Sequence, residues 1–257
     1  MYIKVLLQPI ILACLLAGLT AALSNKGNIR VRSSRNPMSP PGPFCVDVVF
    51  IVQNSCTIAD VLLDAVNHSI IILADMLKSE GQTKIALLTY SAKAKELIPL
   101  KSASEFLRDY SKIDLRGLPK KSAACKNIIQ ANTTDALAMI DNNMEKYFPV
   151  TNTFSISRGK LIVLYTDGVT FTSKFTIGEE QPHVKEKIDS LQSKGVIFAP
   201  IDYDIYFSKP NEVEKKTEFH LYTQTLAKRE FHIIDYFINQ FMNSVFKRYH
   251  CADLNAV

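Results

Sequence analysis

The stretch "VDVVFIVQNSCTI", Val46–Ile58, decides the fold, because it is an apolar run that ends abruptly in small polar residues. The run is too continuous to leave one face in water, so it predicts a central strand that is buried on both sides. The polar residues that follow, Gln53 to Thr57, stand where a strand of an open sheet delivers a site.

Three further runs have the same character and alternate along the chain with helical patterns. They read "KIALLTY", "KLIVLYT" and "VIFAPID". This alternation predicts an α/β fold with a doubly wound, mostly parallel central sheet that is flanked by helices on both faces. A fifth run, "LIPL" at Leu97–Leu100, contains Pro99, which a central strand would not tolerate, so it predicts an edge strand.

Between the strands, apolar residues recur at the spacing of amphipathic helices, and these stripes are expected to be core. The first helix places His68 on its solvent-facing side, where it is no metal ligand. After the fifth strand, "KPNEVEKK" at Lys209–Lys216 is polar and predicts an exposed loop. The predicted helices are Ala59–Leu77, Thr134–Phe148, Val184–Gly195 and Asp235–His250.

Length and charge limit the classes of function. The chain has 257 residues, 47% of them hydrophobic, which is enough for one compact domain with a sizeable core. Its formal net charge of +5 is spread along the chain and is not gathered into Lys/Arg blocks. Without a basic block or a nucleic-acid-binding motif, we do not expect a nucleic-acid partner.

The beginning of the chain has the pattern of a secretory signal peptide, which we place at residues 1–22. Lys4 supplies the positive charge, Val5–Leu19 is mostly apolar, and small residues follow. The apolar run falls short of the ~20 residues that a membrane-spanning helix needs, so a secreted protein without a membrane span is expected. The remaining chain divides into a flexible basic leader rich in Pro and Ser (23–44), one domain (45–251) and a short tail (252–257).

Four cysteines remain if Cys14 leaves with the signal peptide, and an oxidising compartment then favours two disulfides. Three pairings are possible. Cys45 and Cys251 lie at the two edges of the folded region, which favours joining them and leaves Cys56 to pair with Cys125. The alternative is that Cys56 and Cys125 are free buried thiols.

The same motifs resemble the von Willebrand factor type A domain over almost the whole mature chain, from Val46 to about Cys251. The opening stretch is similar to that family's first strand and metal loop, "KIALLTYS" to its second strand, "ANTTDAL" to its second metal loop, and "KLIVLYTDG" to its fourth strand and third loop. Flanking cysteines such as Cys45 and Cys251 also occur in the family. The resemblance implies the doubly wound fold and a role in protein recognition.

The family's hallmark is a metal-ion-dependent adhesion site of pattern Asp-x-Ser-x-Ser with a Thr and a further Asp, holding a Mg²⁺ that a partner's acidic group completes. Carried over to this sequence, the ligand positions fall on Gln53, Ser55, Thr57, Ala131 and Asp167. One carboxylate and one hydroxyl are therefore missing, and a neutral amide attracts a divalent ion far less than a carboxylate does. The pattern predicts a degenerate site, and no cofactor is expected, with a weak Mg²⁺ site at Ser55, Thr57 and Asp167 as the alternative. We further expect a Cys56–Cys125 disulfide to replace the metal as the tie between the loops.

Two glycosylation sequons are present, at Asn67 on the exposed side of the first helix and at Asn132 beside the second metal loop. No phosphate loop, zinc-protease motif or nucleophile elbow is visible, and no His falls on a strand-end loop to act as a base, so an enzyme is not expected. The sequence therefore predicts a secreted module that binds a matrix or cell-surface protein, by analogy with the family and without metal. Metal-dependent adhesion is the alternative.

Overall fold

A computed structural model describes residues 44–78, 83–116, 131–150, 158–170, 181–203, 209–223, 231–232, 245–249 and 251. All of them belong to the part of the chain from Pro41 to Val257. The predicted signal peptide, nearly all of the leader, the C-terminal tail and Cys125 lie outside the described residues. No helix in the described ranges is both long and apolar enough to cross a bilayer.

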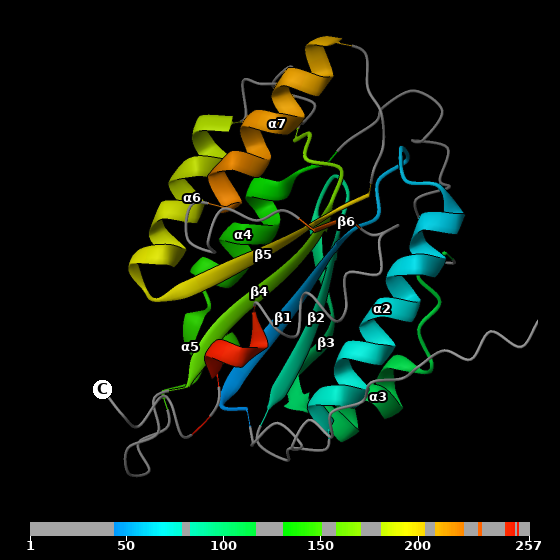
Figure 1. Ribbon diagram of the computed structural model, residues 1–257, viewed down its shortest axis with the longest axis vertical. Coiled ribbons are helices and arrows are strands. Elements are labelled where there is room, and N and C mark those ends of the chain that lie inside the picture. Colours follow the sequence, from blue (N-terminus) through cyan, green and yellow to red (C-terminus); the bar gives the residue numbers. More distant parts are fainter. Residues whose placement is uncertain are drawn as a thin grey trace, which may run out of the picture. The chain divides into compact units, whose positions relative to one another are not determined.

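The described residues form a six-stranded sheet in the order β3-β2-β1-β4-β5-β6 (Figure 1). Every neighbouring pair is parallel except β2 and β3, which run antiparallel. The predicted doubly wound sheet is confirmed, and the segment with Pro99 lies in the edge strand β3, as expected. The strands are β1 (Val46–Gln53), β2 (Lys84–Tyr90), β3 (Ala94–Ser102), β4 (Gly159–Thr166), β5 (Val196–Asp202) and β6 (Phe231–His232).

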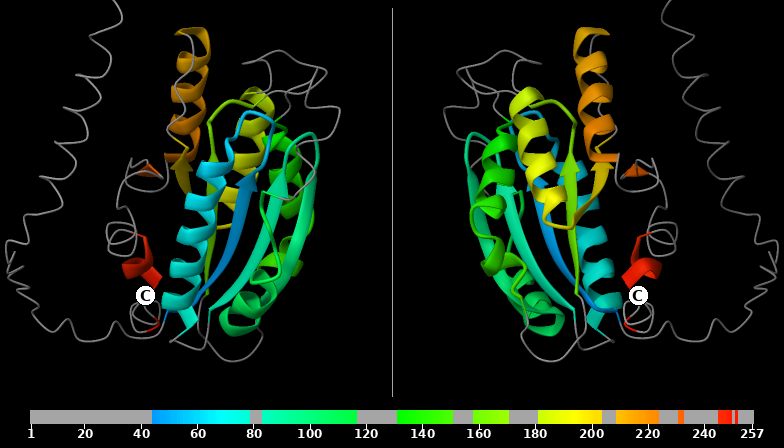
Figure 2. Two further views of the ribbon diagram at one scale, coloured as in Figure 1. Left: turned by 90° about the vertical axis from the view of Figure 1, so that its right-hand side faces the viewer. Right: turned by 90° about the vertical axis from the view of Figure 1, so that its left-hand side faces the viewer.

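Helices cover both faces of the sheet (Figures 1 and 2). Alternate residues of β1 enter two separate cores, since Val48 and Phe50 pack with one cluster and Val49 and Ile51 with the other. Helices α2 and α3 contribute to the first core, and α4, α5, α6 and α7 to the second. The helices are α2 (Asp60–Lys78), α3 (Ala103–Tyr110), α4 (Thr133–Asp141), α5 (Met144–Tyr147), α6 (Gln181–Ser193), α7 (Lys209–Thr223) and a 3-10 helix (Phe246–Tyr249).

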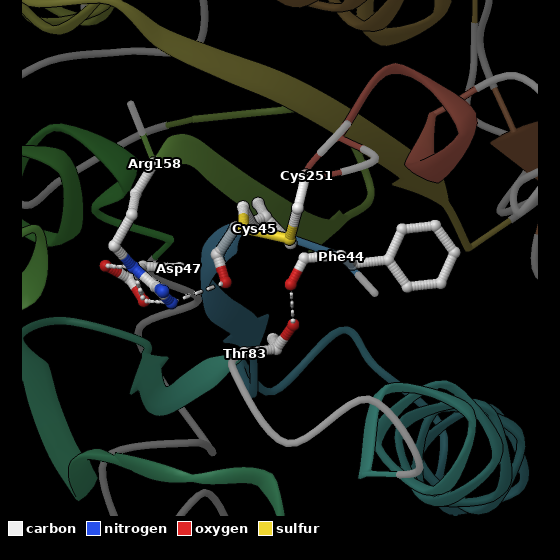
Figure 3. Close-up of a disulfide and its surroundings, with 7 residues drawn as sticks. Phe44, Cys45, Asp47, Thr83, Arg158 and Cys251 are labelled. Carbon is white, nitrogen blue, oxygen red and sulfur yellow. Dashed lines mark hydrogen bonds and ion pairs between the residues drawn. A yellow bond between two sulfur atoms is a disulfide. The ribbon is translucent and has the colours of Figure 1, made fainter. Parts of the chain in front are cut away.

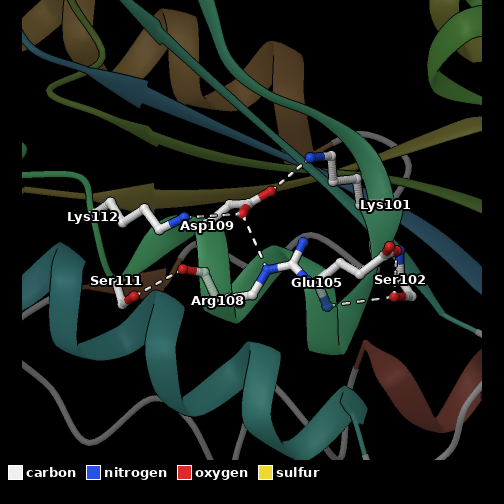
Figure 4. A network of polar contacts seen from close by, with 7 residues as sticks. All are labelled: Lys101, Ser102, Glu105, Arg108, Asp109, Ser111 and Lys112. Atoms are coloured by element: carbon white, nitrogen blue, oxygen red, sulfur yellow. Dashed lines mark hydrogen bonds and ion pairs between the residues drawn. The ribbon is translucent and has the colours of Figure 1, made fainter.

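Helix α3 is short and does not appear among the sequence predictions. A capping box fixes its start, because the Glu105 main-chain N–H donates to the Ser102 side chain and Glu105 reaches back to the main-chain N–H of Ser102 (Figure 4). Further along the helix, Asp109 Oδ2 lies 2.6 Å from Lys101 Nζ. The other oxygen of Asp109 lies within 3.9 Å of the cationic groups of Arg108 and Lys112. Such local polar contacts stabilise a helix whose core contact comes from Phe106 and Tyr110.

Two sequence predictions about helices are wrong. Lys209–Lys216, predicted as an exposed loop, is the first half of helix α7. The buried face of this helix can be recognised in the sequence only when the residues after Lys216 are included. The segment Thr134–Phe148, predicted as one helix, is two, α4 and α5, separated at Asn142. Asn has low helix propensity and competes for main-chain hydrogen bonds, which favours an end there. His68 is exposed, as expected.

The two edges of the domain are joined covalently, as predicted. Cys45 and Cys251 form a disulfide with their Cα atoms 5.0 Å apart (Figure 3). Beside it, the buried Asp47 accepts hydrogen bonds from Arg158, whose Nη2 lies 2.6 Å from Oδ1. The main-chain N–H of Cys45 also donates to the carbonyl of Tyr249. This end of the sheet is therefore held by a disulfide and a buried ion pair, at the opposite end of β1 from the predicted site.

Candidate functional site

Strand register brings the candidate residues to one edge of the sheet. Gln53, the last residue of β1, lies opposite Tyr90 of β2, and Val52 lies opposite Tyr165 of β4. The parallel strands β1, β2 and β4 thus end at the same level, and the loops that follow them meet above the sheet. Thr166 and Asp167 stand at the end of β4, next to Gln53.

The Gln53 side chain is the hub of this edge and is fully buried. Its Oε1 accepts from the main-chain N–H of Asp167 and from the Thr166 hydroxyl, each at 2.9 Å. Because a buried main-chain N–H needs an acceptor, the amide oxygen must face Asp167, and the amide nitrogen then faces the other way. That nitrogen donates to Ser55 Oγ at 2.9 Å.

The other candidate residues are connected to Gln53 by a series of hydrogen bonds. Ser55 Oγ lies 2.7 Å from Thr57 Oγ1, and Thr57 Oγ1 donates to Asp167 Oδ2 over 3.2 Å. The second oxygen of Asp167 accepts from the main-chain N–H of Val169 at 3.1 Å. The structure therefore brings Gln53, Ser55, Thr57 and Asp167 together in one hydrogen-bonded ring.

Burial raises the pKa of the Asp167 carboxyl to about 6, and the nearby Asp202 charge adds to that rise. Hydrogen bonds from Val169, Gln53 and Thr57 act in the opposite direction. Asp202 is itself paired with Lys215 at 2.6 Å, so that lysine is already engaged. A carboxyl with a pKa near 6 is partly protonated at mildly acidic pH.

The second metal loop offers no ligand at the expected position. Ala131 is buried in the apolar core and has no side-chain oxygen. The nearby Thr133 is buried too, and its hydroxyl bonds with the hydroxyls of Tyr90 at 3.3 Å and Thr170 at 2.5 Å. The Thr133 hydroxyl is therefore engaged with Tyr90 and Thr170 and does not replace the hydroxyl missing at Ala131.

These residues do not fit a divalent ion. Mg²⁺ needs about six oxygen ligands in octahedral geometry, but Gln53 turns its N–H groups, not its oxygen, toward Ser55. The Ser55 and Thr57 hydroxyls bond to each other, and Asp167 alone supplies a carboxylate. Within the described part of the chain, no three His, Cys, Asp or Glu side chains are grouped so that they could hold a metal ion. The hydrogen bonds of Gln53 hold the loops together in this structure.

Cys56, between Ser55 and Thr57, is disulfide-bonded, which excludes the free thiol considered for it. Its partner lies outside the described residues, as Cys125 does, so the Cys56–Cys125 pairing stays a prediction. The first loop, at the centre of the candidate site, is therefore held by a disulfide through Cys56.

The two sequon asparagines have different surroundings. Asn67 is half-buried on α2, and the hydroxyl of Ser69 in its sequon is buried against Tyr165. Asn132 is the N-cap of α4, where its Oδ1 accepts from the main-chain N–H of Asp135 and its amide nitrogen donates to Ala92. A glycan on Asn132 would leave its oxygen free to cap the helix. Glycosylation of both stays a prediction.

Helix α7 adds two buried residues that the sequence reasoning missed. Glu218 accepts from both the main-chain N–H and the hydroxyl of Thr170, at 2.9 and 2.8 Å, and Lys215 pairs with Asp202. The sequence does contain a pattern that could have indicated these buried residues. Lys215, Glu218, Phe219 and Tyr222 have the spacing of one helix face, and Pro210 suits a first helical turn.

Comparisons with known proteins agree with this geometry. Residues 47–235 match the von Willebrand factor type A domain, whereas curated proteins give no match. Proximal thread matrix protein 1 from the mussel byssus is similar in structure, with a TM-score of 0.56, 14% identity, and 83% of this chain against 49% of that one covered. A second structure of it, described with a zinc-occupied MIDAS motif, gives a TM-score of 0.55 at 13% identity and the same coverage.

The pilus adhesin SpaC from Lactobacillus rhamnosus GG has a TM-score of 0.53 at 12% identity, with 81% of this chain and 30% of the adhesin covered. This chain thus spans about half the length of the mussel protein and less of the adhesin. At such low identity these structures show the fold alone. The family match covers most of the chain, and the chain therefore belongs to the von Willebrand factor type A domain family.

Proposed function

We propose that this protein is a secreted binding module that recognises a matrix or cell-surface protein without a bound divalent ion. The observation that carries the proposal is the Gln53 amide, which ties the loops after β1 and β4 by hydrogen bonds where the family pattern has a metal-binding carboxylate. The family's role in protein recognition supports it, as do a matrix protein and an adhesin among the similar structures.

The proposal includes the absence of catalysis and of a nucleic-acid partner. Ser55 is hydrogen-bonded to Gln53 and Thr57, neither of which is a base, so among the described residues it has no partner that would activate it as a nucleophile. The predicted signal peptide and the Cys45–Cys251 disulfide support an oxidising, extracellular location.

Metal-dependent adhesion is the second candidate. Ser55, Thr57 and Asp167 still gather three oxygen-bearing side chains within hydrogen-bonding distance of one another. The mussel structure with zinc in its MIDAS motif supports metal binding at the corresponding place in a protein of this fold. In this chain an ion would have to displace the hydrogen bonds of Gln53.

Thermal unfolding separates the two. The secreted protein is stripped with EDTA, dialysed and melted in millimolar Mg²⁺, Mn²⁺ or Zn²⁺ and in chelator. A metal-independent module melts at the same temperature throughout, whereas an ion bound at the site raises the melting temperature by mass action. Capture of partners from an extracellular-matrix extract, in Mg²⁺ and in EDTA, gives the same proteins under the first proposal. Reduced and unfolded protein controls for nonspecific capture.

A further inference from the structure

A chain of hydrogen-bonded side chains runs from α7 to the end of β1. Glu218 Oε1 lies 2.8 Å from Thr170 Oγ1, which lies 2.5 Å from Thr133 Oγ1. Thr133 Oγ1 lies 3.3 Å from the Tyr90 hydroxyl, which lies 3.4 Å from Gln53 Oε1. All five side chains are at most 1% exposed. We call them the Glu218 relay.

Each hydroxyl of the relay has only one proton to donate, so the hydrogen bonds along the relay can be donated in either of two directions. When Glu218 is ionised, its Oε1 can only accept, so the Thr170 hydroxyl, whose oxygen lies 2.8 Å away, must donate to it beside the Tyr222 hydroxyl. Thr133 then donates to Thr170, and Tyr90 donates to Thr133. In this state the Tyr90 proton points away from Gln53.

When Glu218 is protonated, the direction reverses. Its Oε2 already faces the main-chain N–H of Thr170, so the proton belongs on Oε1, from which it is donated to the Thr170 hydroxyl. Thr170 then donates to Thr133 and Thr133 to Tyr90. Tyr90 donates toward Gln53 Oε1 and Thr166 Oγ1. The protonated state therefore adds a donor at the hub of the candidate site.

We propose that Glu218 is a proton-binding switch whose protonation turns the relay toward Gln53 and fastens α7 to the strand-end loops. Ionised Glu218 places a charge in the interior with no ion pair to a cation among the described residues. A buried charge without a counter-ion weakens the structure that encloses it. Uptake of one proton removes that charge without removing a hydrogen bond.

The charged groups around Glu218 agree with this assignment. Asp167, in the loop after β4, adds a second buried carboxyl, and Tyr222 donates to Oε1 from the next turn of α7. From β5 the nearest acid is Asp202, which is neutralised by Lys215. From α6, the side-chain amide of Gln181 donates to the main-chain carbonyl of Glu214 on α7.

Helix α4 brings both a favourable dipole and a further carboxylate to the region around Glu218. Its N-terminus begins at Thr133, and the helix dipole there favours a negative charge. Asp135, in the same turn, accepts the main-chain N–H of Ala94 and so faces β3. On balance, burial raises the pKa of Glu218 to about 7, with hydrogen bonds from Tyr222 and Thr170 lowering it and Asp167 raising it further.

The substitution Glu218→Gln tests the switch, since the amide is neutral at every pH and can donate to Thr170 from the Oε1 position. The thermal midpoint of the wild type is expected to rise by several degrees as the pH falls from 8 to 5.5. The variant should melt above the wild type at pH 8 and close to it at pH 5.5. Its remaining pH dependence should lie mainly below about pH 6, where folded Asp167 takes up its proton.

Glu212→Gln is the matched control, because Glu212 lies on the same helix and pairs with the exposed Lys216. It should keep the wild-type pH profile. If Glu218→Gln melts below the wild type by the same amount at both pH values, Glu218 is only a structural hydrogen-bond acceptor and the switch is wrong.

Hydrogen exchange of the wild-type protein gives an independent test if the variant does not fold. After correction for intrinsic exchange, the main-chain amides of α7 should open on the order of tenfold more often at pH 8 than at pH 6, as expected for one titrating group. The amides of α2, on the other face of the sheet, provide the reference. Equal pH dependence in α7 and α2 would overturn the proposal.

Discussion

The main-chain N–H of Asp167 donates to the side-chain oxygen of Gln53 over 2.9 Å, and this contact fixes the orientation of the Gln53 amide. The oxygen is held by β4, so the nitrogen must donate toward Ser55. A carboxylate at position 53 would present an acceptor to Ser55, whereas the amide presents a donor. The exchange of a carboxylate for an amide at position 53 therefore removes an oxygen that could bind a metal ion in the first loop.

We predict that Gln53→Met destabilises the domain by about 2–3 kcal/mol, because it keeps the side-chain volume but leaves the Asp167 N–H without its acceptor. Urea unfolding followed by circular dichroism measures the loss. Gln192→Met is the matched control, since the amide nitrogen of Gln192 is buried and has no hydrogen-bond partner among the described residues, so its removal should cost nothing. Equal losses in both variants would show that the Gln53 hydrogen bonds contribute no stability.

The fold could be predicted from local patterns because every interior strand is buried on both faces, which leaves a continuous apolar run in the sequence. The resemblance to the von Willebrand factor type A domain implied that Gln53, Ser55, Thr57 and Asp167 lie near one another, and the structure brings them together. The amide orientation could not be predicted, because it depends on the main-chain N–H of Asp167, which directly follows another strand.

Helix α7 was missed for a related physical reason. Its buried face contains Lys215 and Glu218, which a pattern of apolar residues counts as solvent-exposed. Partners that are distant in sequence, Asp202 for Lys215 and Thr170 for Glu218, make those positions suitable for burial. The Glu218 relay likewise joins five segments of the chain, and no local motif contains it.

A restored site tests the proposed loss of metal binding. We predict that Gln53→Asp with Ala131→Thr melts below the wild type in EDTA, because it places a second carboxylate beside Asp167. Millimolar Mg²⁺ should bring the melting temperature back up, since the ion binds the folded state only. The wild type should not respond. A wild-type response to Mg²⁺ would support the metal-dependent alternative.

The Cys45–Cys251 disulfide closes a loop with a sequence separation of 206, so its removal should increase the entropy of the unfolded chain considerably. Replacing both cysteines with Ser is expected to lower the free energy of unfolding by about 3–5 kcal/mol. Urea unfolding measures it, and peptide mapping without reduction checks that Cys56 keeps its own partner. A loss below about 1 kcal/mol would show that the Asp47–Arg158 pair suffices to hold this end.

The stability of the domain should rise as the pH falls from 7 to 5. The pKa of Asp167 is higher in the folded state, about 6 against 3.8, so the folded state binds the proton more tightly in that window. Its contribution is complete below about pH 4 and is lost as the pH rises through about 6. Asp167→Asn, which is neutral throughout, should make the pH profile less steep between 5 and 7, and Glu218 should account for the slope that remains. An unchanged profile would exclude Asp167 as a group that titrates in this window.

Two glycines separate backbone strain from side-chain packing at α7. Gly168 and Gly195 both have a positive φ, 73° and 80°, so alanine at either position costs about 1–2 kcal/mol in the backbone. A Cβ on Gly168 would lie 2.3 Å from the ring of Phe219 on α7, whereas a Cβ on Gly195 would meet no atom within 4 Å. We therefore predict that Gly168→Ala costs more than Gly195→Ala by at least about 1 kcal/mol in urea unfolding. Gly168→Ala should also increase hydrogen exchange in α7. Equal costs would mean that α7 moves away from the loop without resistance, and that its packing against Gly168 contributes little to holding it over the site.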